Sequence, residues 1–396
     1  MNQYKTLNKF PSNDGPVFLR LDLNVPIKNG IILDETRIQK AIETIKCLQS
    51  KTSTLIIATH LGRPSASSNH DEWDQELSTV ILKPALEKYL NTEITYLKTC
   101  VNYAASTPGI YLLENVRFYP GETKNDVDFA HALKGPCTAY VNDAFSCSHR
   151  KHASVHAITQ LLPSYAGLLL DHELKTLNHL FCPPKKPMMA IIGGSKVSTK
   201  INVLKSLINT VDYMVIGGAM ANTFLKAQGK DVGRSLVEDN AINLCKELLS
   251  STYKNKIILP LDFITADNLE ALSHQCQDSG EKIEGMIFDF GPKSLAKVQE
   301  KLDLCKTVLW NGPLGAYEFG IYDRQSCNLA RIIAKQTKDT KLMSIAGGGD
   351  TLAVINKSDT TKDFTYLSTA GGAFLTWLEN ASLPGIDALI QTSKLQ

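Results

Sequence analysis

Residues 189–200 read Met189-Ala-Ile-Ile-Gly-Gly-Ser-Lys-Val-Ser-Thr-Lys200, the pattern of a buried strand, a glycine-rich turn and a helix start. The same order returns in Ser344-Ile-Ala-Gly-Gly-Gly-Asp-Thr351 and in Leu367-Ser-Thr-Ala-Gly-Gly-Ala373. Glycine lets the backbone approach a ligand closely, and a helix N-terminus offers free N–H groups and the positive end of a dipole. A tight turn without a ligand is the commoner cause of any single Gly-Gly pair, but three such turns together favour phosphate binding.

These turns differ from two common nucleotide-binding loops, because none of them fits GxxxxGK(S/T) or GxGxxG. In the first turn, Lys196 and Lys200 are four residues apart, so they share a helix face and can reach one phosphate chain if the helix begins by Lys196. In the second turn, Asp350 follows three glycines, where its carboxylate either caps the helix or binds Mg²⁺. Phosphoryl transfer normally uses Mg²⁺, which favours the metal.

A further predicted strand and turn is Thr307-Val-Leu-Trp-Asn-Gly-Pro-Leu-Gly315. Glu318 lies a few residues beyond it, and its carboxylate could accept hydrogen bonds from ribose hydroxyls. Taken alone, Glu318 is better interpreted as an acidic residue in a solvated loop.

Short apolar runs alternate with longer amphipathic stretches along the whole chain of 396 residues. This alternation predicts an α/β fold with parallel sheets and helices on both faces. Because a single core stops growing near about 250–300 residues, two domains are favoured over one large sheet. The predicted strands are 17–23, 55–59, 110–113, 139–142, 188–192, 213–216, 257–259, 307–310 and 342–345. The predicted helices include 37–49, 80–90 and 200–208.

A boundary between two halves is predicted within residues 170–185. Prolines cluster just there, at positions 183, 184 and 187. Residues 165–180 are predicted to form a helix that joins the halves, which are taken as 1–172 and 173–380. The tail, 381–396, follows the final helix and could return to either half.

The composition excludes several classes of protein. A formal net charge of +2 is too small to make nucleic acid or an anionic membrane the main partner. The nine cysteines form no CxxC pair, so free thiols in a reducing cytosol are favoured over disulfides or a cysteine metal site. Residues 1–10 lack the apolar core of a signal peptide, and no apolar run reaches membrane-spanning length. We therefore expect a cytoplasmic protein.

Arginines gather in the first half, which holds five of the eight: Arg20, Arg37, Arg63, Arg117 and Arg150. Several of them follow predicted strands, and ligands of parallel sheets bind beyond the carboxyl ends of the strands. A surface ion pair is the commoner role of one arginine, but repeated placement after strands favours a small substrate with two anionic ends. Arg20 lies inside a strand and is predicted to be the structural partner of a carboxylate.

Two other groups of polar residues lie near these arginines. Asp22 and Asn24 alternate at a strand end, so they point to one face and either bind a substrate hydroxyl or form an Asx turn. The spacing of His149, His152 and His156 resembles a metal site, but the basic residues among them would repel a cation. A helix start in a basic pocket is the preferred interpretation of that segment.

The chain resembles the phosphoglycerate kinase family over nearly its whole length, through motifs that occur in the same order. They are Arg20-Leu-Asp-Leu-Asn-Val-Pro26, His60-Leu-Gly-Arg-Pro64, Glu114-Asn-Val-Arg-Phe118, Val141-Asn-Asp-Ala-Phe145, His149-Arg150, Gly193-Gly-Ser-Lys196, Leu261-Asp-Phe-Ile-Thr-Ala-Asp267, Trp310-Asn-Gly-Pro313, Gly347-Gly-Gly-Asp-Thr351 and Ser368-Thr369.

The resemblance implies two Rossmann-like domains joined by a hinge, with the C-terminal tail packed on the first, in a monomer. It implies that the first domain binds 3-phosphoglycerate or 1,3-bisphosphoglycerate through Asp22, Leu23, Asn24, Arg37, His60, Leu61, Gly62, Arg63, Arg117 and Arg150. It implies that the second binds MgADP or MgATP through Lys200, Glu318, Gly348, Gly349, Asp350 and Thr351, with Lys196 and Asn311 close to the phosphates.

The nucleophile of such a reaction is a carboxylate that is already ionised near pH 7, so no general base is expected. Catalysis would then consist of alignment and charge neutralisation. We assign these tasks to Arg37, Lys196, Mg²⁺ and the helix start at Gly371 and Gly372, in domains that close to exclude water.

Three residues depart from the family pattern. Ala219 and Ala370 replace glycines, and Thr199 stands where some members carry aspartate. We expect retained activity and leave the effect on turnover open. Two rival functions are a kinase for another carboxylate, such as a carbamate or acetate, and a nucleotide-binding protein without phosphoryl transfer.

Overall fold

The computed structural model describes residues 4–12, 15–181, 184–250, 252–271, 273–368, 370–380 and 382–395. By its internal contacts the chain divides into two compact units. The first unit is Met1–Leu180 together with Ser382–Gln396, and the second unit is Phe181–Ala381. Within the described residues, no helix is long and apolar enough to cross a membrane.

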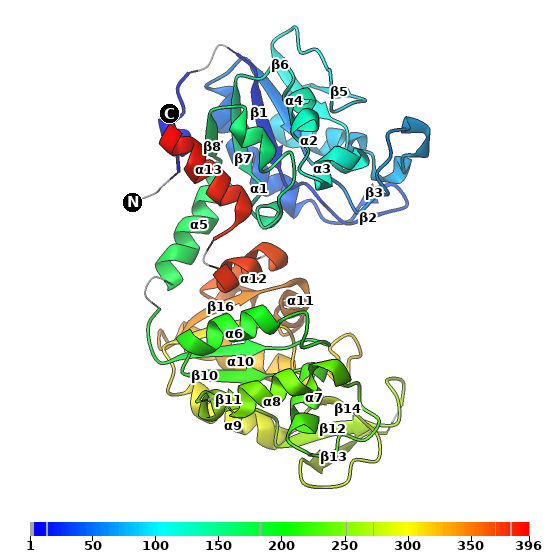
Figure 1. Ribbon diagram of the computed structural model, residues 1–396, viewed down its shortest axis with the longest axis vertical. Helices are drawn as coiled ribbons and strands as arrows, with labels where there is room; N and C mark the ends of the chain where they lie inside the picture. The colour runs from blue at the N-terminus through cyan, green and yellow to red at the C-terminus, as the bar shows by residue number, and fades with distance from the viewer. Residues whose placement is uncertain are drawn as a thin grey trace. The chain divides into compact units, whose positions relative to one another are not determined.

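The first unit is built on a six-stranded sheet with the order β5-β6-β4-β1-β7-β8, in which every neighbouring pair is parallel (Figure 1). Its strands are β1 (Val17–Leu21), β4 (Thr54–Ala58), β5 (Ile94–Leu97), β6 (Gly109–Leu113), β7 (Ala139–Asp143) and β8 (Ser164–Ala166). A short antiparallel pair follows β1, formed by β2 (Ile27–Lys28) and β3 (Ile31–Ile32). The helices are α1 (Thr36–Gln49), α2 (Lys83–Leu90), α3 (Pro120–Thr123), α4 (Val127–Lys134), α5 (Leu168–Phe181) and α13 (Pro384–Leu395).

The first sheet is buried on both faces, as alternation along β1 shows. Leu19 belongs to the core that includes Ile45 of α1 and Leu86 of α2. The neighbouring Phe18 points to the other face, where its ring centroid lies 6.0 Å from that of Tyr140. A strand buried on both faces needs a nearly continuous apolar run, which is why β1 and β4 are visible in the sequence.

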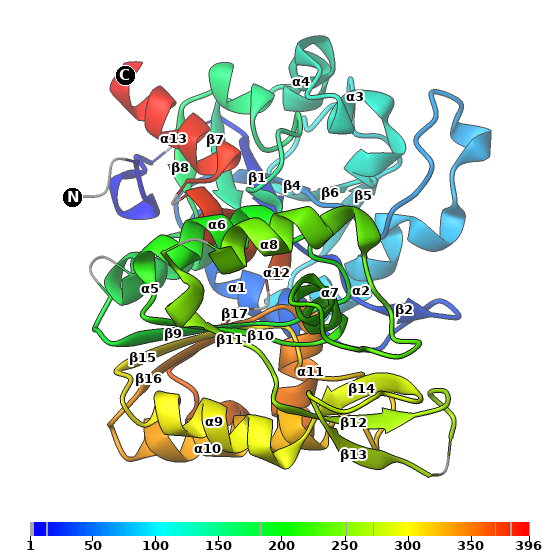
Figure 2. The ribbon, with the colours of Figure 1, turned by 60° about the horizontal axis from the view of Figure 1, so that its bottom comes forward.

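The second unit repeats this plan with a parallel sheet of order β11-β10-β9-β15-β16-β17. Its strands are β9 (Met188–Ile192), β10 (Tyr213–Ile216), β11 (Ile257–Ile258), β15 (Thr307–Asn311), β16 (Met343–Gly347) and β17 (Tyr366–Ser368). The helices are α6 (Ile201–Thr210), α7 (Ala219–Ala227), α8 (Ile242–Ser250), α9 (Pro292–Leu302), α10 (Arg324–Lys338), α11 (Gly349–Lys357) and α12 (Gly371–Asn380). Figure 2 shows α6 and α8 on one face of this sheet and α9 and α10 on the other.

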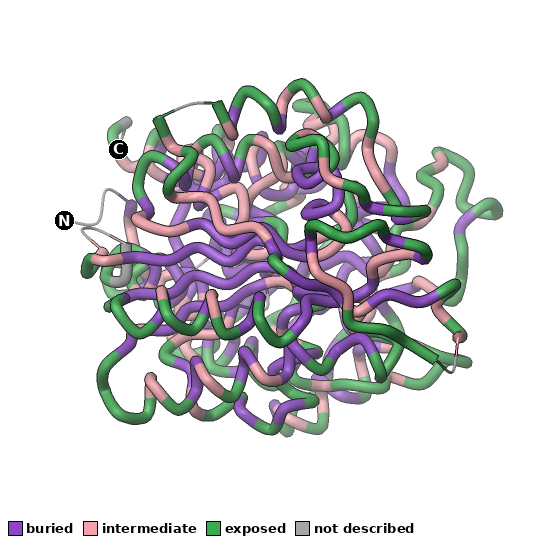
Figure 3. Tube along the Cα trace, turned by 90° about the horizontal axis from the view of Figure 1, so that it is seen from below, coloured by how far each residue is buried: buried purple, intermediate pink, exposed green. Residues whose placement is uncertain are grey.

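The second unit also carries an antiparallel sheet of order β13-β12-β14, which the sequence did not predict. Its strands are β12 (Asp262–Ala266), β13 (Gln275–Asp278) and β14 (Met286–Phe290). The polar edge strand β13 lacks an apolar run, so no strand signal is visible there. The main core of the unit surrounds the fully buried Trp310 of β15, and Figure 3 shows that the parallel strands are the most continuously buried part of the trace.

The predicted fold class, two α/β units that each contain a parallel sheet, is confirmed. The helix predicted over 165–180 is wrong at its start. Tyr165 lies in β8, where it pairs with Val141 of β7, and α5 begins at Leu168. Three buried residues are enough to complete the sheet beside β7, but they are too few to give a periodic signal.

Two other predicted helices also begin later than expected. The helix predicted over 80–90 is a 3₁₀ turn, Thr79–Leu82, followed by α2, whose first turn contains Pro84. Helix α6 begins at Ile201, with Lys200 as its N-cap, so Lys196 precedes the helix and shares no helix face with Lys200. The proposed pairing of these two lysines along one helix is therefore wrong.

The close packing of the turn after β9 predicts a large effect of Gly193→Ala. A methyl group there would overlap the Pro313 carbonyl oxygen and the backbone of Gly312, which are not free ends of flexible side chains. We expect the substitution to lower the free energy of unfolding by about 3 kcal/mol, measured by urea denaturation and circular dichroism. Gly280→Ala is the matched control in the same unit, because nothing lies within 4 Å of its added methyl group. Equal stability of the two variants would contradict the packing argument.

Candidate functional site

The first candidate site lies at the carboxyl edge of the first sheet. Asp22 follows β1, His60 follows β4, Arg117 follows β6 and Arg150 follows β7. Arg37 comes from the first turn of α1. Parallel strands present their carboxyl ends at one edge, so residues far apart in the sequence are brought together there.

The carboxylate of Asp22 joins three segments of this site. Its Oδ2 atom forms an ion pair with Nη1 of Arg37 and accepts a hydrogen bond from the hydroxyl of Ser146. Its Oδ1 atom accepts from the backbone N–H of Asn24 at 3.3 Å, which is the Asx turn that was one of the two sequence interpretations. The side chain of Arg37 remains one-third exposed.

The segment 60–63 is fixed between two strand ends. The side-chain oxygen of Asn24 accepts from the N–H of Gly62 at 2.8 Å, and Nη1 of Arg117 donates to the Gly62 carbonyl at 2.7 Å. Leu61 is fully buried, and its carbonyl accepts from the Asn115 amide at 2.8 Å. Arg63 is exposed. Hydrogen bonds thus hold the backbone of this segment in place, and the segment ends in the exposed side chain of Arg63.

His60 is buried, with 3% of its surface exposed, and it is held neutral. Burial lowers its pKa well below the ordinary value, and the charges of Arg20, Arg117, Arg37 and Arg150 lower it further. A neutral imidazole can accept a hydrogen bond, and Nδ1 lies 3.2 Å from Nη2 of Arg20. The site therefore keeps its positive charge on arginines.

Arg20 does not form the direct ion pair that the sequence predicted. In the described part of the chain its guanidinium contacts the Leu21 carbonyl, His60 and Cys147, and its Nε donates to the Ser154 hydroxyl at 2.8 Å. That hydroxyl donates in turn to the buried carboxylate of Glu122 at 2.6 Å. The sequence predicted that Arg20 contacts a carboxylate directly. In the structure Ser154 lies between Arg20 and the Glu122 carboxylate, so the two are linked only through the serine hydroxyl.

The segment 149–156 consists of turns that lead into a short 3₁₀ helix, Ala157–Gln160, with His156 as its N-cap, so the helix start that the sequence predicted lies at the end of the segment. The imidazole of His149 accepts from Nε of Arg150 at 3.0 Å, whereas His152 lies 3.6 Å from the Glu122 carboxylate. His156 contacts a third residue, Asn125, at 3.3 Å. The three rings have separate partners and do not form a metal site together.

Asp22, His60 and Cys147 place possible metal-binding atoms within 4.8 Å of one another. Arg37 is bonded to Asp22, however, and Arg20 is hydrogen-bonded to His60. Two guanidinium groups therefore already lie where a cation would have to bind. This edge of the sheet is suited to anions.

The second candidate site is the set of turns at the carboxyl edge of the second sheet. The ammonium of Lys200 donates to the Gly193 carbonyl and to the side-chain oxygen of Asn311, both at 2.6 Å. The amide of Asn311 donates at 2.6 Å to the carbonyl of Gly347, and the Thr351 hydroxyl accepts from Gly312 N–H at 2.7 Å. These bonds tie together the turns after β9, β15 and β16.

The turns after β16 and β17 also lie close together. A methyl group on Gly371 would lie 3.1 Å from the Cα of Gly348, so the two turns are in near contact. Gly349 begins α11, and Gly371 and Gly372 begin α12. Thr369, part of the motif beside them, lies outside the described residues. Two helix N-termini are thereby directed toward one region.

Lys200 is the titratable group most affected by this arrangement. Burial lowers its pKa to about 8, although the charge of Asp350 opposes the shift. In the described residues, no carboxylate lies within ion-pair distance of its ammonium. Lys196, by contrast, is exposed, and its carbonyl accepts a hydrogen bond from the Thr199 hydroxyl at 2.8 Å.

Asp350 does not cap α11, which was one of its two predicted roles. The N-cap is Gly348, and Asp350 lies in the first helical turn with an exposed side chain. Its Oδ1 atom accepts from the hydroxyl of Tyr317 at 3.0 Å. The carboxylate stays available to a ligand.

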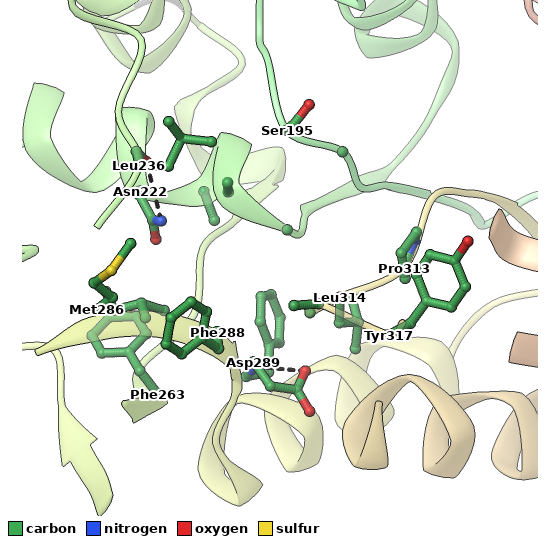
Figure 4. A pocket seen from close by; sticks show the side chains of 18 of the residues that line it. Ser195, Asn222, Leu236, Phe263, Met286, Phe288, Asp289, Pro313, Leu314 and Tyr317 are labelled. Carbon is green, nitrogen blue, oxygen red and sulfur yellow. Dashed lines mark hydrogen bonds between the residues drawn. The ribbon is translucent and has the colours of Figure 1, made fainter. Parts of the chain in front are cut away.

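An apolar cavity of about 340 Å³ opens beside these turns (Figure 4). Glu318 and Asp350 lie in its lining together with Tyr317, whose hydroxyl donates to Asp350. The sequence analysis missed most of its walls, because they come from separate segments and lack a shared motif. They include Asn222, Leu236, Met286, Phe288 and Leu314.

The three departures from the expected pattern have different surroundings. Ala219 is the first residue of α7 and lines the cavity. Ala370 is buried just before α12, whereas Thr199 is exposed. Of the three, Ala219 is therefore the one in a position to contact a ligand in the cavity.

Comparison with known proteins gives one consistent result. The profile of the family described as phosphoglycerate kinase matches residues 7–381. The phosphoglycerate kinase of Bartonella quintana is 43% identical over 399 residues, covering 98% of this chain and 99% of that protein. That of Chelativorans sp. is 43% identical over 401 residues, covering 98% of this chain and 100% of that protein. The solved structure of phosphoglycerate kinase from Coxiella burnetii matches with a TM-score of 0.87 at 36% identity, covering 98% of this chain and 99% of that chain.

The surroundings of His60 predict that its pKa in the folded protein lies well below the ordinary histidine value. Nuclear magnetic resonance of the ring protons, assigned with His60→Asn, measures this directly. Because the folded pKa is depressed, the unfolded state binds a proton that the folded state does not. Stability from this group is therefore lost as the pH falls below about 6.5. A titration midpoint near 6.5 in the folded protein would contradict the assignment.

Proposed function

This chain belongs to the phosphoglycerate kinase family, and we propose that its first unit binds the glycerate substrate while its second unit binds the nucleotide. The reaction it catalyses moves a phosphoryl group reversibly between 1,3-bisphosphoglycerate and ADP, giving 3-phosphoglycerate and ATP in glycolysis. The rival functions, a kinase for another carboxylate and a binding protein without activity, are set aside by this membership.

The main support for placing the nucleotide on the second unit is the position of Lys200. Its ammonium is partly buried among uncharged oxygens of Gly193 and Asn311, and its lowered pKa reflects the cost of a charge without a partner. A phosphate group would supply the missing negative charge. The N-termini of α11 and α12 begin beside the same turns and would add backbone N–H donors.

We assign the substrate to the arginine-lined edge of the first sheet. Guanidinium groups of Arg37, Arg63, Arg117 and Arg150 would bind the phosphate and carboxylate ends of the glycerate. Asp22 and Asn24 would contact its hydroxyl group, with Leu23 and the segment 60–62 forming the wall. The neutral state of His60 supports this assignment, because the ring can accept a hydrogen bond from a guanidinium without adding charge.

We assign the nucleotide to the glycine turns and the cavity of the second unit. Lys200, Asn311 and the segment 348–351 would hold the phosphates, and Glu318 would accept from the ribose hydroxyls. The base would enter the apolar cavity. The exposed carboxylate of Asp350 fits Mg²⁺, a cation that prefers oxygen ligands and that would neutralise charge on the nucleotide phosphates.

The chemistry requires alignment more than proton transfer. A carboxylate oxygen of 3-phosphoglycerate attacks the γ-phosphorus of ATP, and the bond from phosphorus to the β,γ-bridging oxygen breaks to release ADP. The attacking carboxylate is ionised near pH 7, so no side chain has to remove a proton. Arg37, Lys196 and the N–H groups of Gly371 and Gly372 would stabilise the charge on the transferring phosphoryl group.

The transfer also requires that water be excluded, because an acyl phosphate hydrolyses. We propose that hinge-bending between the units meets this need when both ligands are bound. A monomer in the cytoplasm is sufficient for this mechanism, since each of the assigned residues comes from one chain.

Arg37→Ala should lower kcat by about 10²–10³-fold, because Arg37 is assigned to the transition state. A coupled assay with 3-phosphoglycerate and MgATP measures kcat and KM separately. Arg331→Ala, which removes an exposed arginine bonded to Asn328, is the control and should leave both constants unchanged. A rise in KM with kcat intact would show that Arg37 only binds the substrate.

Nucleotide binding should take up protons through Lys200 above pH 8. The free lysine, with a pKa of about 8, is largely neutral at higher pH, and adjacent phosphates would favour its charged form. Titration calorimetry of MgADP in buffers with different ionisation enthalpies should show uptake approaching about one proton near pH 9. In Lys200→Met the uptake should be lost, and binding should become less dependent on pH. The same uptake in both proteins would rule out phosphate contact with Lys200.

A further inference from the structure

Ser146 contacts the same carboxylate oxygen as Arg37. Its hydroxyl donates to Oδ2 of Asp22, and this oxygen also forms the ion pair with Nη1 of Arg37. The other oxygen of Asp22, Oδ1, accepts from the backbone N–H of Asn24 at 3.3 Å. Each oxygen of the carboxylate therefore has a donor besides the guanidinium or in place of it, and these donors fix the plane of the carboxylate.

The pair between Asp22 and Arg37 uses a single nitrogen of the guanidinium. Pairs of arginine with a carboxylate are frequently bidentate, with two parallel N–H···O bonds. Here the bond from Nη1 to Oδ2 is the hydrogen bond that the Arg37 side chain makes within the described part of the chain. Its Nε and Nη2 atoms find no acceptor among those residues, so these donors are left for a ligand.

The position of the Ser146 hydroxyl is set by the short 3₁₀ helix that follows β7, Phe145–Cys147. The residues on either side of the serine, Phe145 and Cys147, are buried, and the N–H of Cys147 donates to the carbonyl of Ala144 at 3.0 Å. Ser146 itself is half-buried. A hydroxyl between two anchored neighbours is a donor of defined position, whereas the long side chain of Arg37 has many rotamers.

The location of Ser146 connects it with the chemistry of the first unit. The turn after β7 lies at the same edge of the sheet as the turns after β1 and β4. Its two partners are Asp22, which is assigned to the substrate hydroxyl, and Arg37, which is assigned to the transferring phosphoryl group. A serine that contributed only to folding would have no need to share an oxygen with that arginine.

We propose that Ser146 is a positioning residue for phosphoryl transfer, whose hydroxyl holds the Asp22 carboxylate so that Arg37 keeps two donors for the transferring group. This inference rests on the proposed function, in which Arg37 stabilises the transition state. Without the hydroxyl, the carboxylate is free to turn both oxygens toward Arg37 and to form a bidentate pair. That pair would withdraw guanidinium donors from the ligand, and the loss would fall on kcat.

The first test is Ser146→Ala in the coupled assay with 3-phosphoglycerate and MgATP. We expect kcat to fall by about tenfold, the effect of one hydrogen bond, while KM for 3-phosphoglycerate changes by less than about threefold. Ser67→Ala is the matched control and should leave both constants unchanged. Ser67 is also a half-buried serine of the first unit, and its hydroxyl donates to a different carboxylate, that of Glu72 at 2.6 Å. Unchanged kcat in Ser146→Ala, with circular dichroism showing a folded protein, would overturn the inference.

A second pair of variants separates the hydroxyl from the volume of the side chain. Ser146→Thr keeps the hydroxyl, whereas Ser146→Val has nearly the same shape without it. We expect kcat of the threonine variant to exceed that of the valine variant by about tenfold. Any effect of the added bulk on the turn is common to both variants, so this comparison holds even if Ser146→Ala folds poorly. Equal kcat values in the two variants would overturn the role of the hydroxyl.

The third test asks whether Ser146 acts through Arg37. In an Arg37→Ala background, Ser146→Ala should lower kcat further by less than about twofold, because the group that the serine positions is absent. A full tenfold loss in that background would reveal an effect independent of Arg37 and would overturn the inference.

The same variants distinguish this inference from the proposed function. If Arg37→Ala alone leaves kcat unchanged, the assignment of Arg37 to the transition state fails, and the inference fails with it. If Arg37→Ala lowers kcat and Ser146→Ala does not, the inference alone is overturned.

Discussion

A parallel sheet brings the carboxyl ends of all its strands to one edge, and both units are built on this constraint. In the first unit it places Asp22, His60 and Arg117 together although they come from different strand ends. In the second it places the turns of Gly193, Asn311 and Gly347 within hydrogen-bonding distance. Each site is thus a consequence of strand direction, and the side chains on the turns decide its chemistry.

Positively charged side chains dominate the chemistry at both edges, although Asp22 pairs with one of them, Arg37. In the first unit, burial and arginines keep His60 neutral, so the charge resides on guanidinium groups. In the second, Lys200 is surrounded by uncharged oxygens and loses basicity. Such groups cost stability in the free protein, and an anionic ligand would offset that cost. The two units reach the same result with different residues.

The sequence predicted the structure best where one buried strand and the turn after it form a continuous stretch of the chain. Continuous apolar runs revealed β9 and β15 because buried parallel strands require them. It was least informative for short or polar strands such as β8 and β13, and for the start of α6, which separates Lys196 from Lys200. The cavity could not be predicted, because its walls join α7, β14 and the turn after β15, and only folding brings these segments together.

The contrast between the phosphate turns and the cavity has a consequence for selectivity. Lysine and helix N-termini bind phosphates through charge and backbone N–H groups, and such contacts do not depend on what the phosphates are attached to. An apolar wall likewise accepts any flat ring of suitable size. Charge at the turns and flat apolar surface in the cavity therefore do different work, the first holding phosphates and the second holding a ring. The buried polar side chains of the described lining are used to fix its walls, because both oxygens of Asp289 accept backbone N–H groups and the amide of Asn222 donates to the Leu236 carbonyl.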